Sequence, residues 1–282
     1  MSKISPSRDA DPADGAFIGS VTLITGAGNG IGRSLARALS RRGALVLATD
    51  IDAEGVATTV DMISADGGQA WAMTLDVTST HDYETARDFC MDRWGRIDRV
   101  VNNVGIVTVG LPEYVPLEEW SRVIDVNLMG IVRSNDVLLP VLISQGHGQI
   151  VNTASTSGLF PYSFDRLSYV ATKAAIVAMS EALALYLRPQ GIDVSCICPA
   201  GVRTTMTERM KHFGPPRPLG TPALPVVMPD DFAEHIADSL AAKQFLICSV
   251  PEAYDAVARR GADIDRNLEA AVVQYGFQPV SN

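Results

Sequence analysis

A tyrosine and a lysine four residues apart are the side chains in this sequence best suited to acid–base chemistry. Tyr169 and Lys173 lie in a stretch with a helical pattern, where residues four apart share a face and their Cβ atoms are about 5 to 6 Å apart. The chain has four lysines and 7 tyrosines, so chance would give only about 0.1 such pairs. Because a nearby ammonium lowers the pKa of a phenol from its ordinary value of about 10, the pair predicts a general base that works near neutral pH.

A serine just beyond a predicted strand can hold a substrate oxygen at the same place. Ser155 follows a strand expected at 149–154 and precedes Tyr169 by 14 residues, so its hydroxyl would face the same end of the sheet. Hydroxyl side chains are common in such loops and several stand beside it, so spacing alone does not single it out. Tyr162 is less suited to be the base, because the residue four positions later is Arg166, which stays protonated and cannot relay a proton.

A glycine-rich stretch near the N-terminus predicts where a phosphate binds. Thr25–Gly32 joins a strand expected at 21–24 to a helix expected at 33–42. Glycines at such a junction let the backbone approach a pyrophosphate, which the N–H groups and the dipole of the helix N-terminus favour. An ordinary tight turn between a strand and a helix is the alternative.

An acid at the end of the next strand favours NAD as the cofactor. Asp50 follows a strand expected at 45–49 and comes 18 residues after Gly32, where a dinucleotide-binding fold places its acid for the ribose hydroxyls. The carboxylate would also repel a 2′-phosphate, and Asn29 and Ile51 offer that phosphate no positive charge. The sequence therefore predicts NAD, with NADP as the less favoured cofactor.

Strands and helices alternate along most of the chain, which predicts one α/β domain with a mostly parallel sheet. The short strands are rich in Val, Ile and Leu without alternating polarity, as expected when helices cover both faces of a sheet. The expected strands are 21–24, 45–49, 70–75, 99–103, 149–154, 193–198 and 245–249, and the expected helices are 33–42, 53–65, 83–94, 117–142, 168–187 and 230–241.

Polar residues stand at the carboxyl ends of several of these strands, where the ligand crevice of an open parallel sheet lies. Asp50, Asp76 and the run 102–105 occupy such positions. Their convergence on one crevice favours a binding site there. The alternative for Asp76 is a helix cap for the segment that starts near Ser79.

Three segments lie outside the regular alternation of strands and helices. Residues 203–228 are rich in proline and have little periodicity, which favours a substrate lid, with a surface excursion as the alternative. Residues 251–276 are expected to form a polar helical tail. Residues 1–16 contain several aspartates and no apolar run, so a disordered leader is expected there rather than a signal peptide, with the catalytic domain at 17–282 and the cytoplasm as the default location.

The composition points to a small-molecule ligand. A net charge of -9 and a pI near 4.9 disfavour nucleic acid and anionic membrane as partners. No run of 18 apolar residues is free of charge, which predicts no membrane span. The four cysteines are too scattered for a disulfide scaffold and are expected as core thiols; Cys196 and Cys198 lack the neighbours that a metal site requires.

Three motifs, in this order, resemble those of the short-chain dehydrogenase/reductases. The resemblance spans nearly the whole chain and rests on Thr25–Gly32, Asn102–Gly105 and the Tyr169–Lys173 pair. It implies a single-domain, doubly wound, mostly parallel Rossmann sheet with helices on both faces. It also implies a catalytic tetrad, which consists of Asn127, Ser155, Tyr169 and Lys173. In this tetrad Asn127 would position a water that completes a proton relay.

The same resemblance implies which residues contact the ligands, without a metal. The implied cofactor contacts are Gly26, Gly28, Asn29, Gly30, Ile31, Gly32, Asp50, Ile51, Asp76, Val77, Asn103, Val104, Gly105, Tyr169, Lys173, Pro199, Val202 and Thr204. The implied substrate pocket is formed by Ser155, Leu159, Phe160, Tyr162 and Tyr169, together with the lid. The chain departs from the family pattern at 199–201, where an alanine separates the proline from the glycine.

The implied reaction is hydride transfer between NAD and a hydrophobic secondary alcohol or its ketone, of an aromatic, steroid-like or terpenoid kind. Tyr169 would take the hydroxyl proton, Ser155 would hold the oxygen and Lys173 would bind the nicotinamide ribose. The lysine and the positive nicotinamide ring would together lower the pKa of Tyr169 toward neutral pH. An NADP-dependent ketone reductase, a non-catalytic dinucleotide-binding sensor or scaffold, and a sugar-nucleotide epimerase or dehydratase are the alternatives; the last is disfavoured by the glycine spacing and by the lack of a larger C-terminal domain. Because the helix expected at 168–187 is apolar nearly all round, a homodimer or homotetramer is expected.

Overall fold

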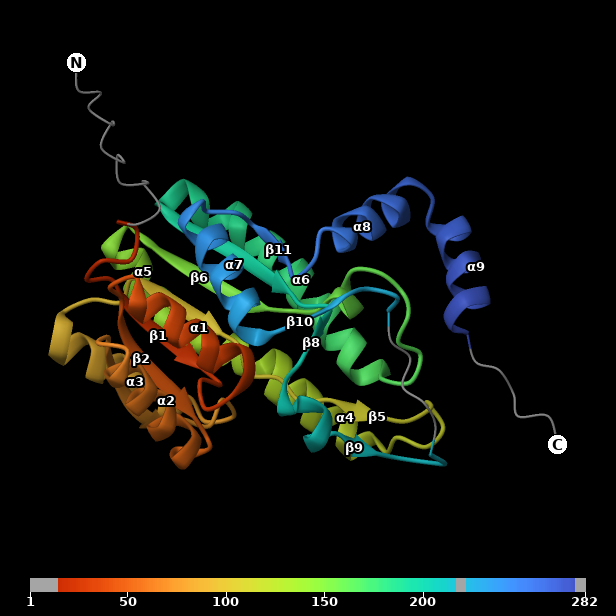
Figure 1. The fold of residues 1–282 in the computed structure, drawn as a ribbon, viewed down its shortest axis with the longest axis horizontal. Helices are drawn as coiled ribbons and strands as arrows, with labels where there is room; N and C mark the ends of the chain where they lie inside the picture. Colours follow the sequence, from red (N-terminus) through yellow and green to blue (C-terminus); the bar gives the residue numbers. More distant parts are fainter. Residues whose placement is uncertain (1–14, 217–221, 277–282) are drawn as a thin grey trace, which may run out of the picture.

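Seven parallel strands form the central sheet of the protein (Figure 1). The computed structural model describes residues 15–216 and 222–276, so nearly all of the expected leader lies outside the described residues, as does part of the expected lid. The strands lie in the order β11, β7, β6, β4, β1, β2, β3. They are β1 (Val21–Thr25), β2 (Leu45–Asp50), β3 (Gln69–Thr74), β4 (Arg99–Asn102), β6 (Gly148–Thr153), β7 (Ile192–Cys198) and β11 (Leu246–Cys248).

The strand order reverses between β1 and β4. From β1 the chain continues outward through β2 and β3, whereas β4, β6, β7 and β11 extend in the opposite direction. The connections on the two sides of this point leave the sheet in opposite directions, which opens a crevice at the carboxyl ends of β1 and β4. The site should therefore lie beyond Thr25 and Asn102.

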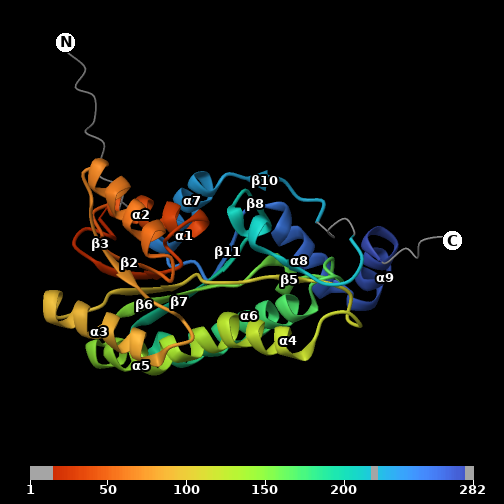
Figure 2. The same ribbon diagram turned by 90° about the horizontal axis from the view of Figure 1, so that it is seen from below.

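Helices cover both faces of the sheet, as Figure 2 shows. One face carries α1 (Gly30–Arg41), α2 (Ala53–Ala65) and α7 (Pro229–Ala241). The other carries α3 (Thr80–Trp94), α4 (Leu117–Ile124), α5 (Gly130–Gln145) and α6 (Leu167–Leu187). This arrangement confirms the predicted doubly wound Rossmann sheet.

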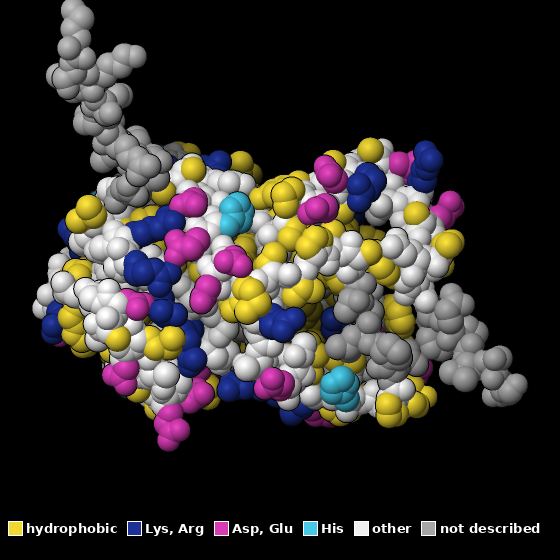
Figure 3. All heavy atoms as spheres, viewed as in Figure 1, with side chains coloured by type: hydrophobic (Ala, Val, Ile, Leu, Met, Phe, Trp, Pro, Cys, Tyr) yellow, Lys and Arg dark blue, Asp and Glu magenta, His cyan; other side chains and the backbone are white. Residues whose placement is uncertain are grey.

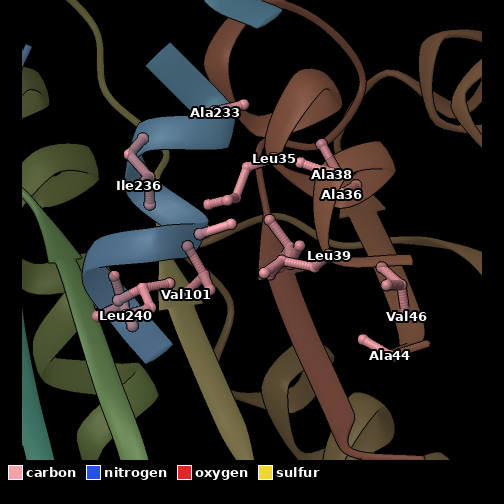
Figure 4. Close-up of a cluster of buried hydrophobic side chains, with 14 of the residues drawn as sticks. Leu35, Ala36, Ala38, Leu39, Ala44, Val46, Val101, Ala233, Ile236 and Leu240 are labelled. Carbon is pink, nitrogen blue, oxygen red and sulfur yellow. The ribbon is translucent and has the colours of Figure 1, made fainter. Parts of the chain in front are cut away.

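The core beneath α1 and α7 holds the glycine turn in place. Leu35 and Leu39 of α1 meet Ile236 and Leu240 of α7 above Val101 of β4 (Figure 4). Each of these side chains is almost completely removed from water, which stabilises the fold by roughly 1.5 to 3 kcal/mol per residue. The packing fixes where α1 begins, and with it the position of its free N–H groups.

Charged side chains join the outer surfaces of the same two helices. Arg42 lies 2.9 Å from Glu234 and 2.7 Å from Asp238, measured between Nη2 and the carboxylate oxygens. Figure 3 shows acidic and basic side chains interleaved on this face rather than separated into patches.

Two predicted elements differ from the structure. The helix expected at 117–142 is interrupted, because a π-helical turn at Asp125–Met129 separates α4 from α5. The expected tail is two helices, α8 (Glu252–Ala262) and α9 (Ile264–Tyr275). The tail is also less polar than expected, since Leu268, Val272 and Val273 are exposed on α9.

Two short parallel ladders attach the expected lid to the rest of the fold. β9 (Lys211–His212) pairs with β5 (Thr108–Val109), and β10 (Val226–Val227) pairs with β8 (Gly201–Val202). Between β8 and β9, Thr205–Arg209 forms a short 3-10 helix called η4. The described part of the 203–228 segment is therefore anchored at both ends.

The four cysteines are buried and unbonded, which confirms the prediction of core thiols. The Sγ atoms of Cys196 and Cys198 are 3.8 Å apart on β7. Among the described residues, no cluster of His, Cys, Asp or Glu could hold a metal ion.

Two helical segments, Leu117–Gln145 and Leu167–Gln190, are long and apolar enough to cross a membrane by length and composition alone. This is weak evidence for a membrane, because the core helices of soluble proteins have the same properties. Both segments also pack one face against the sheet (Figure 2).

Candidate active site

A cavity of about 270 Å³ opens at the carboxyl ends of the central strands. We call it the cleft. Its walls come from the glycine turn, the ends of β2, β4 and β6, helix α6 and the start of the lid. The lining residues are Gly26, Asn29, Gly30, Ile31, Asp50, Ile51, Asn103, Val104, Gly105, Ile106, Val107, Thr153, Ala154, Ser155, Tyr169, Lys173, Pro199, Ala200, Val202, Thr204, Thr205, Met206 and Arg209.

The glycine turn presents an uncapped helix N-terminus to the cleft. Asn29 is the N-cap of α1, but its side chain makes no capping hydrogen bond, and the first turn carries no acidic residue. Gly30 has a φ of 53°, and a Cβ atom there would lie 3.2 Å from Thr204 Cγ2. Free N–H groups at the positive end of a helix, reached over a surface without side chains, fit the pyrophosphate of a dinucleotide.

Asp50 closes the other side of the turn. Its Oδ2 accepts a hydrogen bond from the Gly28 N–H at 2.9 Å, and its Oδ1 accepts one from the Asp52 N–H at 3.0 Å. Each oxygen keeps further acceptor capacity toward the cleft, so the carboxylate can receive hydroxyl protons while it holds the turn in shape. Gly28 and Gly32 shape the turn from behind and do not line the cleft.

Asp76 and Val77 are not brought to the cleft wall. Asp76 Oδ1 accepts hydrogen bonds from both the N–H and the hydroxyl of Thr78, each at 2.8 Å. The adjacent helix α3 is capped by Ser79. Asp76 therefore holds the turn before α3, a local role close to the helix cap that was the alternative to a cofactor contact. Val77 is buried beside Gly130.

Lys173 is buried at the bottom of the cleft. It is 2% exposed, and its Nζ donates a hydrogen bond to the Thr153 carbonyl oxygen at 2.7 Å. Nζ lies only 3.2 Å from where a Cβ atom would stand on Gly105, so the absence of a side chain there makes room for the ammonium. No carboxylate pairs with it among the described residues, and burial lowers the pKa of Lys173 to about 8.

Tyr169 lies beside this lysine, as their spacing predicted. Lys173 Nζ is 5.5 Å from the centre of the Tyr169 ring. Burial raises the pKa of Tyr169 to about 12, and interaction with the Ser155 hydroxyl opposes that rise. Lys173 and a bound, positively charged nicotinamide ring would together have to offset this effect of burial, so a base that is active near neutral pH stays a prediction.

Ser155 completes this wall of the cleft. It follows β6, and its Oγ accepts a hydrogen bond from the Ser157 N–H at 3.1 Å while it starts a short 3-10 turn. This local bond fixes the position of Oγ, while the hydroxyl itself donates toward the Pro199 carbonyl oxygen at 3.5 Å. A polar oxygen placed between Ser155 and Tyr169 could accept from one hydroxyl and exchange a proton with the other.

Asn127 stands behind the cleft in the π-helical turn and is fully buried. Its Oδ1 accepts from the Ile106 N–H at 2.8 Å, while its Nδ2 donates to the Ile106 carbonyl at 3.0 Å and to Thr172 Oγ1 at 3.2 Å. Both amide protons are used. A water positioned by this side chain must therefore bind to the remaining acceptor site of Oδ1.

Of the residues expected to form the substrate pocket, Ser155 and Tyr169 line the cleft, whereas the three apolar or aromatic ones from 159–162 do not. Leu159 is buried in the core, and Phe160 packs against that core. Tyr162 donates to or accepts from Ser157 Oγ at 2.7 Å, and it lines a separate apolar cavity of about 230 Å³ beside α9. The apolar side chains that line the cleft include Ile106, Val107 and Met206, which no sequence motif indicated.

Two other residues of the cleft wall carry polar groups that sequence reasoning missed. Thr153 Oγ1 is buried and has no hydrogen-bond partner. Arg209 reaches the cleft from η4. Neither stands in a recognisable motif, so only the fold could reveal them.

The comparisons with known proteins agree on one family. Residues 20–213 match the family described as short chain dehydrogenase. Cyclohexanol dehydrogenase of Acinetobacter sp. (strain SE19) is 36% identical over 192 residues, which cover 67% of this chain and 76% of the relative. A 3-alpha-(or 20-beta)-hydroxysteroid dehydrogenase of Mycobacterium tuberculosis is 35% identical over 213 residues, covering 75% of this chain and 80% of the relative.

Solved structures give the same result. A short-chain dehydrogenase/reductase of Burkholderia phymatum in complex with NAD has a TM-score of 0.80 and 27% identity, and the match covers 95% of this chain and 99% of the other. Together with the family match over most of the sequence, this similarity establishes that the chain belongs to the short-chain dehydrogenases.

Proposed function

We propose that this oxidoreductase, which acts on an alcohol or ketone as its relatives do, uses NAD and a hydrophobic secondary alcohol. The main support for this proposal is that one cleft is lined by Asp50, by the uncapped N-terminus of α1 and by the Ser155–Tyr169–Lys173 group. These groups stand at opposite ends of the cleft, as a dinucleotide with its reactive ring beside the base requires.

The residues divide the work of proton transfer. Ser155 holds the substrate oxygen, and Tyr169 takes its proton during alcohol oxidation. When bound, the oxidised nicotinamide ring supplies the hydride acceptor and a positive charge. Lys173 contributes an ammonium that favours the ionised form of Tyr169, and its position beside Gly105 suits a hydrogen bond to the nicotinamide ribose.

The chemistry of the cleft wall supports a hydrophobic substrate. Ile106, Val107 and Met206 provide an apolar surface in the same cleft as the hydroxyls of Ser155 and Tyr169. Such a wall binds hydrocarbon and leaves the polar contacts to fix one oxygen. The names of the two relatives, for cyclohexanol and for hydroxysteroids, support a carbocyclic alcohol of the aromatic, steroid-like or terpenoid kind.

The test is a panel of secondary alcohols in aryl, steroid, terpenoid and short aliphatic classes, each with NAD or NADP. Formation of the reduced nicotinamide is followed by its absorbance. We expect NAD-dependent turnover of one carbocyclic class. Turnover of only short aliphatic alcohols, or turnover with NADP alone, would contradict the proposal.

NADP-dependent ketone reduction is the second candidate, and one observation favours it. Arg209 lines the same cleft as Asp50 and lies 3.7 Å from Asp52, whereas the sequence prediction rested on Asn29 and Ile51, which carry no charge. The panel is therefore also run in the direction of ketone reduction with both reduced cofactors.

A further inference from the structure

The lid carries a cation to the adenosine end of the cleft. Arg209, the last residue of η4, lines the same cavity as Asp50 and Ile51. Its Nη2 lies 3.7 Å from Asp52 Oδ2, and the Asp52 N–H in turn donates to Asp50. The guanidinium thus stands close to the acid that faces the ribose.

The segment that holds Arg209 lies along the edge of the cofactor side of the cleft. At its start, Thr204 approaches Gly30, and Thr205 Oγ1 donates toward Asn29 Oδ1 at 3.4 Å. At its end, Arg209 meets Asp52, the N-cap of α2. The described part of the lid therefore follows the path from the pyrophosphate site to the ribose site.

Only Lys173 and Arg209 bring a positive charge to the cleft among the described residues that line it. Lys173 is committed to the nicotinamide end. Arg33 is close to the glycine turn, but its guanidinium donates to Thr59 Oγ1 at 3.1 Å and to the Gly28 carbonyl, outside the cleft wall. Arg209 is therefore the cation available to a phosphate at the ribose end.

The present partner of Arg209 holds it weakly. The separation of 3.7 Å is longer than a hydrogen bond, and the Arg209 and Asp52 side chains are 63% and 38% exposed. An exposed ion pair of this kind contributes little to stability, so exchanging Asp52 for another anion costs little. A phosphate offers the guanidinium two parallel, charge-assisted hydrogen bonds instead.

We propose that Arg209 is a specificity residue for the cofactor, which contacts the 2′-phosphate of NADP and lets this chain bind NADP as a second cofactor despite Asp50. The inference rests on the proposed function, since it assumes a dinucleotide in the cleft. It places one determinant of cofactor choice on the lid rather than on the glycine turn or β2.

The experiment measures the dissociation constants of NAD and NADP by calorimetry, without substrate. Arg209→Ala should weaken NADP by about tenfold, the equivalent of one charge-assisted hydrogen bond, and should change NAD by less than about twofold. Arg203→Ala is the matched control, because Arg203 is an exposed arginine on the same segment that does not line the cleft, and it should change neither constant.

A second variant tests the same contact and should change NADP affinity in the opposite direction. Asp52→Asn keeps a residue able to cap α2 but removes the competing charge, so it should tighten NADP more than NAD. Equal losses for the two cofactors in Arg209→Ala, no loss for either, or no binding of NADP by the unaltered protein would overturn the inference. Failure to bind NAD at all would instead overturn the proposed function.

Discussion

At the scale of a single residue, Lys173 serves the proposed reaction but lowers the stability of the fold. Its pKa is lowered to about 8 from an ordinary value of 10.5, because the ammonium is buried without a carboxylate partner. The unfolded chain therefore binds this proton more tightly than the folded one. The ammonium lowers stability at all pH values below about 8, and the free energy of unfolding rises as the pH increases from about 8 toward 10.5.

Replacing this lysine with an apolar residue should therefore increase the stability of the protein and remove most of its activity. Lys173→Met is expected to raise the free energy of unfolding at pH 7 by about 1 to 3 kcal/mol and to lower the turnover rate at least about 100-fold. Urea denaturation at pH 7 and pH 10 measures the first effect, and the gain should shrink at the higher pH. Lys243→Met, at an exposed lysine paired with Asp193, is the control. A variant that is less stable than the parent at pH 7 would show that Lys173 stabilises the fold.

Tyr169 should be the residue whose loss affects chemistry alone. Tyr169→Phe removes the proton acceptor and keeps the ring, so turnover should fall by about 10²- to 10⁴-fold while the dissociation constant of NAD stays nearly the same. Because burial raises the pKa of Tyr169 to about 12, the rate of alcohol oxidation should increase with pH through the neutral range. Tyr162→Phe, which loses hydrogen bonds to Ser157 and Thr156 outside the cleft, should keep most of its activity. Equal losses in the two variants would contradict the assignment.

At the scale of elements, the buried carboxylate of Glu119 connects α4 to the lid; we call this contact the latch. Glu119 Oε1 accepts a hydrogen bond from Lys211 Nζ of β9 at 2.7 Å, and Oε2 accepts from Thr108 Oγ1 of β5 at 3.1 Å. Hydrogen bonds from Arg122, together with those from Lys211 and Thr108, lower the pKa of Glu119 to about 2. The latch is therefore intact above the ordinary pKa of about 4.5 and weakens only as the pH falls toward 2.

Removing the charge of this latch should loosen the lid. Glu119→Gln is expected to increase the KM for the alcohol several-fold, and to speed proteolytic cleavage within 203–216, because Lys211 loses its ionic partner. The exposed neighbour Glu118 offers a matched control as Glu118→Gln. Unchanged cleavage and KM in Glu119→Gln would show that the two strands alone hold the lid.

The sequence predicted the sheet better than the site, and particular residues show why. Buried parallel strands are rich in Val, Ile and Leu, so the strand expected at 45–49 differs from β2 by one residue. The π-helical turn depends on Asn127 bonding to the backbone of Ile106, a contact between distant segments that leaves no local pattern. The orientation of Tyr162 likewise depends on hydroxyl partners in a folded loop. Glycine spacing and the Tyr–Lys pair were predictable because each lies within one short, continuous stretch of sequence.

At the scale of the whole molecule, the outer face of α4, α5 and α6 leaves apolar side chains uncovered. The exposed residues there include Leu117, Ile124, Met129, Val132, Leu167, Leu185 and Tyr186. Such a surface suggests a partner subunit, so the homodimer or homotetramer stays a prediction, as does the cytoplasmic location.

Leu185 provides the test of this surface. Leu185→Glu should shift the protein from an oligomer to a smaller species in sedimentation velocity, because a charge would be buried between subunits. Ile18→Glu is the control: Ile18 is 73% exposed, against 82% for Leu185, but it lies beside Gly43 at the end of α1, on the opposite side of the sheet. A monomer in the unaltered protein, or sedimentation of the protein with lipid vesicles, would contradict the expected subunit contact.

All four thiols are buried, so their reactivity can be used to measure local opening of the fold. An alkylating reagent can modify Cys90, Cys196, Cys198 or Cys248 only when the surrounding structure opens, so each labelling rate measures the opening of one place. Cys248 lies on β11, which has a neighbour on one side only, whereas β7 lies between two strands. Mass spectrometry of timed samples should therefore find Cys248 labelled before Cys196 and Cys198, and the reverse order would mean that the sheet does not open from this edge.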